Sequence, residues 1–157
     1  MNYQSVINEI EQEIQSLFGQ GKVANYIPAL AKTDPKQFAM SITCLDGTTY
    51  QTGAYKKRFS IQSISKVFTF TMALRIYGKE LYSRVWREPS GDPFNSLVQL
   101  EYESGIPRNP FINAGAIVVS DTLVSEFKSA SAAFENILTF IREASSAQDI
   151  ACDLGVS

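Results

Sequence analysis

A serine and a lysine stand three positions apart in the tetrapeptide Ser63-Ile64-Ser65-Lys66. On a helix, residues i and i+3 share a face, so the hydroxyl and the amine can approach each other. A serine hydroxyl attacks a carbonyl carbon efficiently only when a base takes its proton, and a lysine whose pKa is lowered by burial can act as that base. The spacing therefore predicts Ser63 as a nucleophile and Lys66 as its base.

The sequence contains a second copy of this pattern, Ser125-Glu126-Phe127-Lys128. Ser125 comes late in its expected helix and is followed by Glu126, which is typical of a solvated helix end. Ser63, by contrast, stands at an expected helix start, where backbone N–H groups and the helix dipole can stabilise an oxyanion. We therefore expect the first copy to carry the chemistry.

The composition narrows the classes of function that remain. The 157 residues include no histidine, which excludes a Ser-His-Asp triad, a Cys-His dyad and a His-bearing zinc site built from these residues alone. A net charge of -2 does not favour nucleic-acid binding, and no apolar run reaches the roughly 18 residues of a membrane span. The N-terminus lacks a signal-peptide pattern, so we expect a cytoplasmic protein.

Hydrophobic periodicity and turn residues predict an α+β chain in which helices surround one β-hairpin. The expected helices and strands are a helix over 5–18, strands over 38–45 and 48–52 joined by Asp46-Gly47, and helices over 64–77, 113–127 and 134–144. Ser60 is the expected N-cap of the helix that carries Lys66, and Gly78 is its expected end. The segment 88–105 is rich in turn residues and is expected to be a loop.

The helix over 64–77 is apolar on most sides, which predicts a buried central helix. A lysine within such a helix is costly to bury unless it has a task. Two interpretations of Lys66 remain open on this basis. It is either the catalytic base or part of a capped core helix, with its side chain reaching out to solvent.

With the segment FSIQSISKVFTF in view, the sequence resembles the serine-dependent glutaminases, which share the fold of β-lactamases and penicillin-binding proteins. Three further strings carry the resemblance, namely 21–30 (GKVANYIPAL), 88–95 (EPSGDPFN) and 107–117 (PRNPFINAGAI). The resemblance implies a β-lactamase-like fold with an N-terminal helix, a β-hairpin, a buried nucleophile helix and further helices.

The resemblance also implies an activity and a set of site residues. Family members hydrolyse L-glutamine to L-glutamate and ammonia without a metal or an organic cofactor. Carried over by position, Ser63 matches the nucleophile and an oxyanion N–H donor, and Lys66 matches the base. Tyr26 and Gln62 match residues that line the substrate pocket, and Asn113 matches a side chain that hydrogen-bonds glutamine.

Each carried-over residue also has a purely structural interpretation. Tyr26 fits core packing with a hydrogen-bonded hydroxyl, Asn113 fits a helix cap, and Gln62 fits an exposed first-turn residue. The turn residues of the 88–95 and 107–110 segments favour structural loops over catalytic ones.

The resemblance covers nearly all of this chain but only about the first half of a family member. Residues 1–157 are therefore expected to be the N-terminal portion of a single glutaminase domain whose C-terminal half is absent, and the isolated chain is expected to be inactive. The full-length protein is expected to form a homo-oligomer. The alternatives are a penicillin-recognising acylase or esterase of the same fold, and a non-catalytic truncated homologue.

Overall fold

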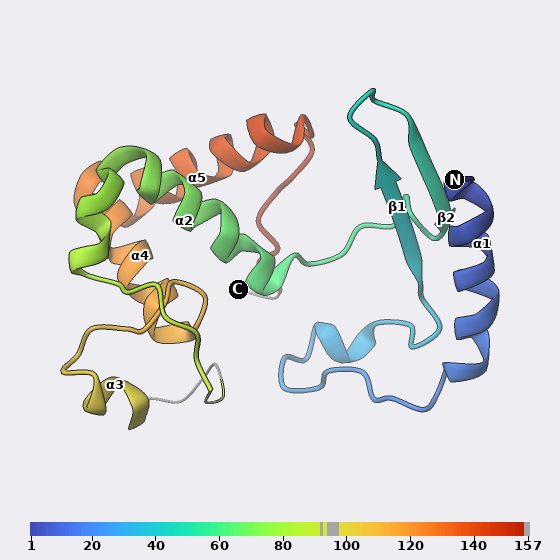
Figure 1. The fold of residues 1–157 in the computed structure, drawn as a ribbon, viewed down its shortest axis with the longest axis horizontal. Coiled ribbons are helices and arrows are strands. Elements are labelled where there is room, and N and C mark those ends of the chain that lie inside the picture. Colours follow the sequence, from blue (N-terminus) through green and yellow to red (C-terminus); the bar gives the residue numbers. More distant parts are fainter. Residues whose placement is uncertain (92, 94–97, 156–157) are drawn as a thin grey trace. The chain divides into compact units, whose positions relative to one another are not determined.

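The computed structural model describes residues 1–91, 93 and 98–155, and it combines helices with one small sheet (Figure 1). The chain divides into two compact units. The first comprises Met1–Ser60 with the residues from Cys152 onward, and the second is Ile61–Ala151. The mixture of elements confirms the predicted α+β class. The assignment of all residues to one domain stays a prediction.

The first unit packs helix α1 (Tyr3–Ile14) against the antiparallel strands β1 (Ala39–Thr43) and β2 (Thr49–Gly53). Side chains alternate along both strands, so the less exposed ones share one face of the sheet. The hydroxyl of Thr52 donates a hydrogen bond to the Glu11 carboxylate, which joins β2 to α1. Two short 3-10 helices complete this unit, η1 (Gln15–Leu17) and η2 (Leu30–Lys32).

The predicted hairpin is confirmed, with its turn at Asp46-Gly47. Gly47 has a φ of 85°, a conformation that costs a residue without a Cβ very little. The Asp46 carboxylate accepts a hydrogen bond from the backbone N–H of Thr48 at 2.9 Å. This hydrogen bond from Thr48 is the main cause of the lowered pKa of Asp46. The two strands begin and end within one or two residues of their predicted limits, because the turn sets their register.

The second unit is helical, and its core lies among α2 (Ser65–Tyr77), α4 (Asn113–Phe127) and α5 (Ala130–Ser145). Five buried side chains form that core: Ala73, Leu81, Val85, Val119 and Leu123. Burying a Leu or Val side chain fully contributes roughly 1.5–3 kcal/mol, so this cluster supplies much of the packing between α2 and α4. The shorter helices of the unit are η3 (Gln62–Ile64), η4 (Gly78–Ser83) and α3 (Val98–Tyr102).

The prediction of a buried helix holds for only one side of α2. Ala73 is fully buried, but Val67 is 51% exposed and Ile76 is 40% exposed. The reason is that α4, α5 and η4 contact α2 from the side of the core, and its remaining apolar residues lack cover within the second unit. An apolar face of this kind is typical of an interaction surface.

The structure corrects several predicted helix limits. The helix predicted over 5–18 is α1, Tyr3–Ile14, followed by the 3-10 turn η1, and the helix predicted over 134–144 begins four residues earlier, at Ala130. Helix α4 spans the predicted residues, and Gly78 ends α2 with a φ of 55°. Ser60 is not the N-cap of α2, because η3 intervenes and Ile64 occupies the cap position without a side-chain hydrogen bond. The loop predicted over 88–105 contains the short helix α3, which the turn residues around it obscured.

Part of the 88–95 string lies outside the described residues, namely Asp92, Phe94 and Asn95. Within the described part of the chain, none of the helices combines the length and the apolar character needed to cross a membrane.

Candidate active site

Ser63 lies in η3, the short 3-10 turn that leads directly into α2. Its side chain is exposed. The residue before it, Gln62, has a φ of 44°, in the left-handed region that residues other than glycine seldom adopt. Such a conformation costs on the order of 1–3 kcal/mol, so the surrounding structure must hold it. The hydroxyl of Ser65 does so in part, because it donates a 2.7 Å hydrogen bond to the carbonyl oxygen of Gln62.

Lys66 stands one helical turn after Ser63, as the spacing predicts. Its amine donates hydrogen bonds to the carbonyl oxygen of Phe111 at 3.0 Å and to Oδ1 of Asn113 at 2.8 Å. Lys66 therefore lies across the start of α4, and its amine does not simply extend into solvent. This geometry contradicts the structural interpretation in which the lysine only reaches out of a core helix.

The partly buried position of Lys66 has an electrostatic consequence. Desolvation disfavours the charged ammonium and lowers the pKa of Lys66 from its ordinary value of 10.5. A larger fraction of the amine is then neutral near pH 7 than in a solvated lysine. A neutral amine can accept a proton, which is what a general base requires.

Asn113 is the first residue of α4, and its side chain does not cap that helix. Ile112 occupies the N-cap position with an extended backbone and no side-chain cap bond. The Asn113 carboxamide oxygen instead accepts the hydrogen bond from Lys66. The helix-cap interpretation of Asn113 is therefore wrong, and its amide belongs to the cluster around Lys66.

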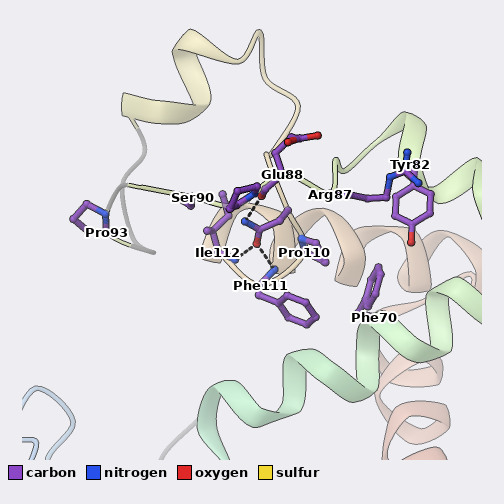
Figure 2. A pocket seen from close by; sticks show the side chains of 11 residues that line it. Phe70, Tyr82, Arg87, Glu88, Ser90, Pro93, Pro110, Phe111 and Ile112 are labelled. Carbon is purple, nitrogen blue, oxygen red and sulfur yellow. Dashed lines mark hydrogen bonds between the residues drawn. The ribbon is translucent and has the colours of Figure 1, made fainter.

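A turn held by Asn109 comes immediately before α4. The Asn109 carboxamide oxygen accepts hydrogen bonds from the backbone N–H groups of Phe111 at 2.9 Å and Ile112 at 3.1 Å. Its Nδ2 donates to the carbonyl oxygen of Glu88 at 2.9 Å (Figure 2). The turn that presents the Phe111 carbonyl to Lys66 is thus tied to the 88–90 segment.

Backbone bonds support the structural interpretation of both loop segments. The N–H of Trp86 donates to the carbonyl oxygen of Pro107 at 2.8 Å, and that of Glu88 donates to the carbonyl oxygen of Arg108 at 2.9 Å. The Arg108 guanidinium also forms an ion pair with the buried Glu103. These contacts align the two segments side by side ahead of α4.

Two open hollows lie near this cluster. One, of about 870 Å³, is lined by Phe70, Phe111, Tyr82 and Arg87 among others, and Figure 2 shows the rings of Phe70 and Phe111 close together. The ring centroids are 5.6 Å apart in an edge-to-face arrangement. The other, of about 530 Å³, is bordered by Asn113 and continues along α4. Neither hollow is lined by Ser63 or Lys66, and the side chain of Ser63 is exposed.

The remaining predicted residues separate into two groups. Gln62 is exposed, as its surface interpretation predicts, although its backbone shapes the turn before Ser63. Tyr26 belongs to the first unit and is 74% exposed, so its core-packing interpretation is wrong. The rival pair behaves as expected. Ser125 and Lys128 are exposed, and Lys128 lies at the C-terminal cap of α4.

Three features of the site were not predicted from the sequence. They are the Phe111 carbonyl as an acceptor for Lys66, the hydrogen bonds by which Asn109 holds the expected turn, and the hydrogen bond from Ser65 to the Gln62 carbonyl. An Asn followed by Pro is a signal for a turn, and it could have pointed to Asn109. Nothing in the residue types indicates which backbone carbonyl a lysine on another helix will reach.

The chain belongs to the glutaminase family, because the family model described as Glutaminase matches residues 21–157. It is 65% identical over 150 residues to a glutaminase of Aliarcobacter butzleri, covering 96% of this chain and 48% of that protein. It is 53% identical over 156 residues to a glutaminase of Pseudoalteromonas translucida, covering 99% of this chain and 50% of that protein. The chain therefore spans about half the length of the curated relatives it matches.

Solved structures to which the chain is similar are also glutaminases. The chain is similar to a solved probable glutaminase of Bacillus subtilis, with a TM-score of 0.70 and 29% sequence identity over 90% of this chain and 41% of that one. The solved glutaminases that it matches have the serine β-lactamase-like fold, which confirms the predicted fold class. The family match also weighs against the penicillin-recognising alternative.

The lowered pKa of Lys66 leads to a first prediction, which can be tested by labelling the chain with acetic anhydride over a range of pH. Only the neutral amine reacts, so a lower pKa moves the labelling midpoint of Lys66 to lower pH. We expect this midpoint to lie below that of the same lysine in the chain unfolded by urea, as measured by mass spectrometry of the Lys66 peptide. A midpoint at or above the unfolded value would contradict the prediction.

Proposed function

We propose that the protein hydrolyses L-glutamine to L-glutamate and ammonia, with Ser63 as the nucleophile and Lys66 as the general base. The observation that carries this proposal is the arrangement of Lys66. Lys66 stands one helical turn after Ser63, and its amine has a lowered pKa and is oriented by Phe111 and Asn113. Membership of the glutaminase family supports the substrate.

The proposed reaction proceeds through an acyl-enzyme. Lys66 takes the hydroxyl proton as Ser63 Oγ attacks the carbon of the glutamine side-chain amide. The tetrahedral intermediate then loses ammonia, which carries the proton returned by Lys66, and an ester to Ser63 remains. Water activated by the same lysine hydrolyses this ester and releases glutamate. The backbone N–H of Ser63 is the proposed donor to the oxyanion.

Three further residues have proposed roles in binding the substrate. Asn113 has an amide close to the Lys66 amine and is proposed to hydrogen-bond glutamine. Gln62 and Tyr26 are exposed polar residues and are proposed to line the pocket. No metal or organic cofactor is proposed for this reaction. A cytoplasmic location and a homo-oligomeric state of the full-length protein stay predictions.

The second prediction concerns the nucleophile and requires an active protein. Residues 1–157 would be joined to the part of the Aliarcobacter butzleri relative that this chain does not cover. We expect Ser63→Ala to lower kcat by at least about a thousandfold, because loss of a primary nucleophile removes the covalent route. Ammonia release is the measurement. Ser125→Ala is the matched control and should stay near the unsubstituted rate. An active Ser63→Ala protein with an inactive Ser125→Ala protein would reverse the assignment.

The third prediction separates a base from a supporting charge at Lys66. Arginine keeps the positive charge but does not lose a proton at neutral pH. In the same joined protein, we expect Lys66→Arg to lower kcat by about a hundredfold or more, close to the effect of Lys66→Ala. Turnover of Lys66→Arg near that of the unsubstituted protein would show that the lysine acts through its charge alone.

The fourth prediction concerns residues 1–157 by themselves. Catalytic groups that act as a unit are strongly non-additive, and the side chain of Ser63 is exposed. We expect no measurable glutamine hydrolysis from the isolated chain. We also expect concentration-dependent association, because roughly 25 cal/mol is gained for each Å² of apolar surface that α2 can cover.

Light scattering and an ammonia assay test this prediction together. Turnover by a monomer at an enzyme-like rate would contradict it. An associating but inactive chain would agree equally with the non-catalytic alternative, and the joined protein distinguishes the two, because only the proposed enzyme gains activity there.

A further inference from the structure

The start of α4 approaches the preceding turn more closely than any side chain would allow. A Cβ atom added at Gly115 would lie 1.8 Å from the carbonyl oxygen of Asn109 and 2.9 Å from Cα of Pro110. Both are backbone atoms, so no side chain can rotate out of the way. Gly115 does not have a positive φ, so glycine is required here for space and not for backbone conformation.

The turn that packs against Gly115 also leads to the hydrogen-bond acceptors of the Lys66 amine. It begins at Asn109, whose carboxamide oxygen accepts the N–H groups of Phe111 and Ile112. The carbonyl oxygen of Phe111 and the side chain of Asn113 then accept the two hydrogen bonds from Lys66. Any shift of the Asn109–Pro110 backbone therefore moves both acceptors.

We propose that Gly115 and Asn109 are positioning residues for Lys66. Gly115 has no side chain, so the turn can pack directly against α4. Asn109 holds the turn by hydrogen bonds, so that the Phe111 carbonyl and the Asn113 carboxamide accept hydrogen bonds from the lysine amine. The catalytic significance of this arrangement rests on the proposed function, whereas the arrangement itself does not.

The turn is also held by contacts on two of its sides. On one side, Nδ2 of Asn109 ties the turn to the carbonyl oxygen of Glu88. On the other, the ring of Phe111 packs edge to face on Phe70 of α2, the helix that also carries Lys66. The turn is thus held between the 88–90 segment and α2, with Gly115 as its closest contact on α4.

The test measures the reactivity of Lys66 towards acetic anhydride in the folded 157-residue chain, at dilutions where light scattering reports a single chain. In Gly115→Ala the turn is displaced, so we expect labelling of Lys66 to accelerate by roughly tenfold as its hydrogen bonds are released. Gly91→Ala is the matched control. Its added methyl group meets no atom within 4 Å, so Lys66 should react at the unsubstituted rate.

Three more variants separate positioning from general loss of stability. Ile141→Ala removes a buried side chain of α5 that is not part of the cluster joining α2 to α4, and it destabilises the second unit. While the chain stays folded, it should leave Lys66 labelling nearly unchanged. Asn109→Ala should accelerate labelling. Asn109→Asp should restore part of the protection, because its carboxylate still accepts the two backbone N–H groups but cannot donate to the Glu88 carbonyl oxygen.

Unchanged Lys66 labelling in both Gly115→Ala and Asn109→Ala would overturn the proposal, as would equal acceleration in Ile141→Ala. If Gly115→Ala does not fold, the comparison of Asn109→Ala with Asn109→Asp decides. Labelling does not depend on turnover, so this test and the test of Ser63 can fail independently.

Discussion

The candidate site depends on the contact between the Lys66 amine and the start of α4. Placing an amine among partly buried groups costs free energy unless acceptors replace the water it loses. Here a backbone carbonyl and a carboxamide do so, at 3.0 Å and 2.8 Å. The compensation is incomplete, and desolvation still lowers the pKa of the lysine. The contact therefore orients the amine, and burial of the amine favours loss of its proton.

This contact is possible because the core sets the position of two helices. Ala73 of α2 and Val119 and Leu123 of α4 are buried in one cluster, so the helices cannot slide past each other without opening a cavity. Gly115 then admits the turn that carries the Phe111 carbonyl. The packed core sets the relative position of the two helices. Within that arrangement, the turn places the Phe111 carbonyl at hydrogen-bonding distance from the Lys66 amine.

The second unit places the candidate nucleophile and base one helical turn apart and leaves the nucleophile exposed. Ser63 is exposed, and part of the apolar surface of α2 is uncovered. The chain spans about half the length of the curated relatives it matches. An acyl-transfer site needs its substrate held against both groups with water controlled, and orientation alone can contribute several kcal/mol to catalysis.

The sequence favours Ser63 over Ser125 as the nucleophile, and this choice stays a prediction. By itself the sequence determined the α+β class, the hairpin at Asp46-Gly47 and the limits of α4. These features follow from short-range rules, namely turn residues that set backbone angles, hydrophobic periodicity and the spacing of side chains on one helix. The long strings that resemble glutaminases indicated the family, and the match of the Glutaminase family model confirmed it.

Only the tertiary structure decided what Lys66 contacts, that Asn113 binds it and does not cap α4, and that Ser60 caps nothing in α2. It also decided that Gly115 must lack a side chain and that one side of α2 stays uncovered. Each of these depends on which atoms of distant segments meet, such as residues 66 and 111. No local preference carries that information, because the packing of the core brings those segments together.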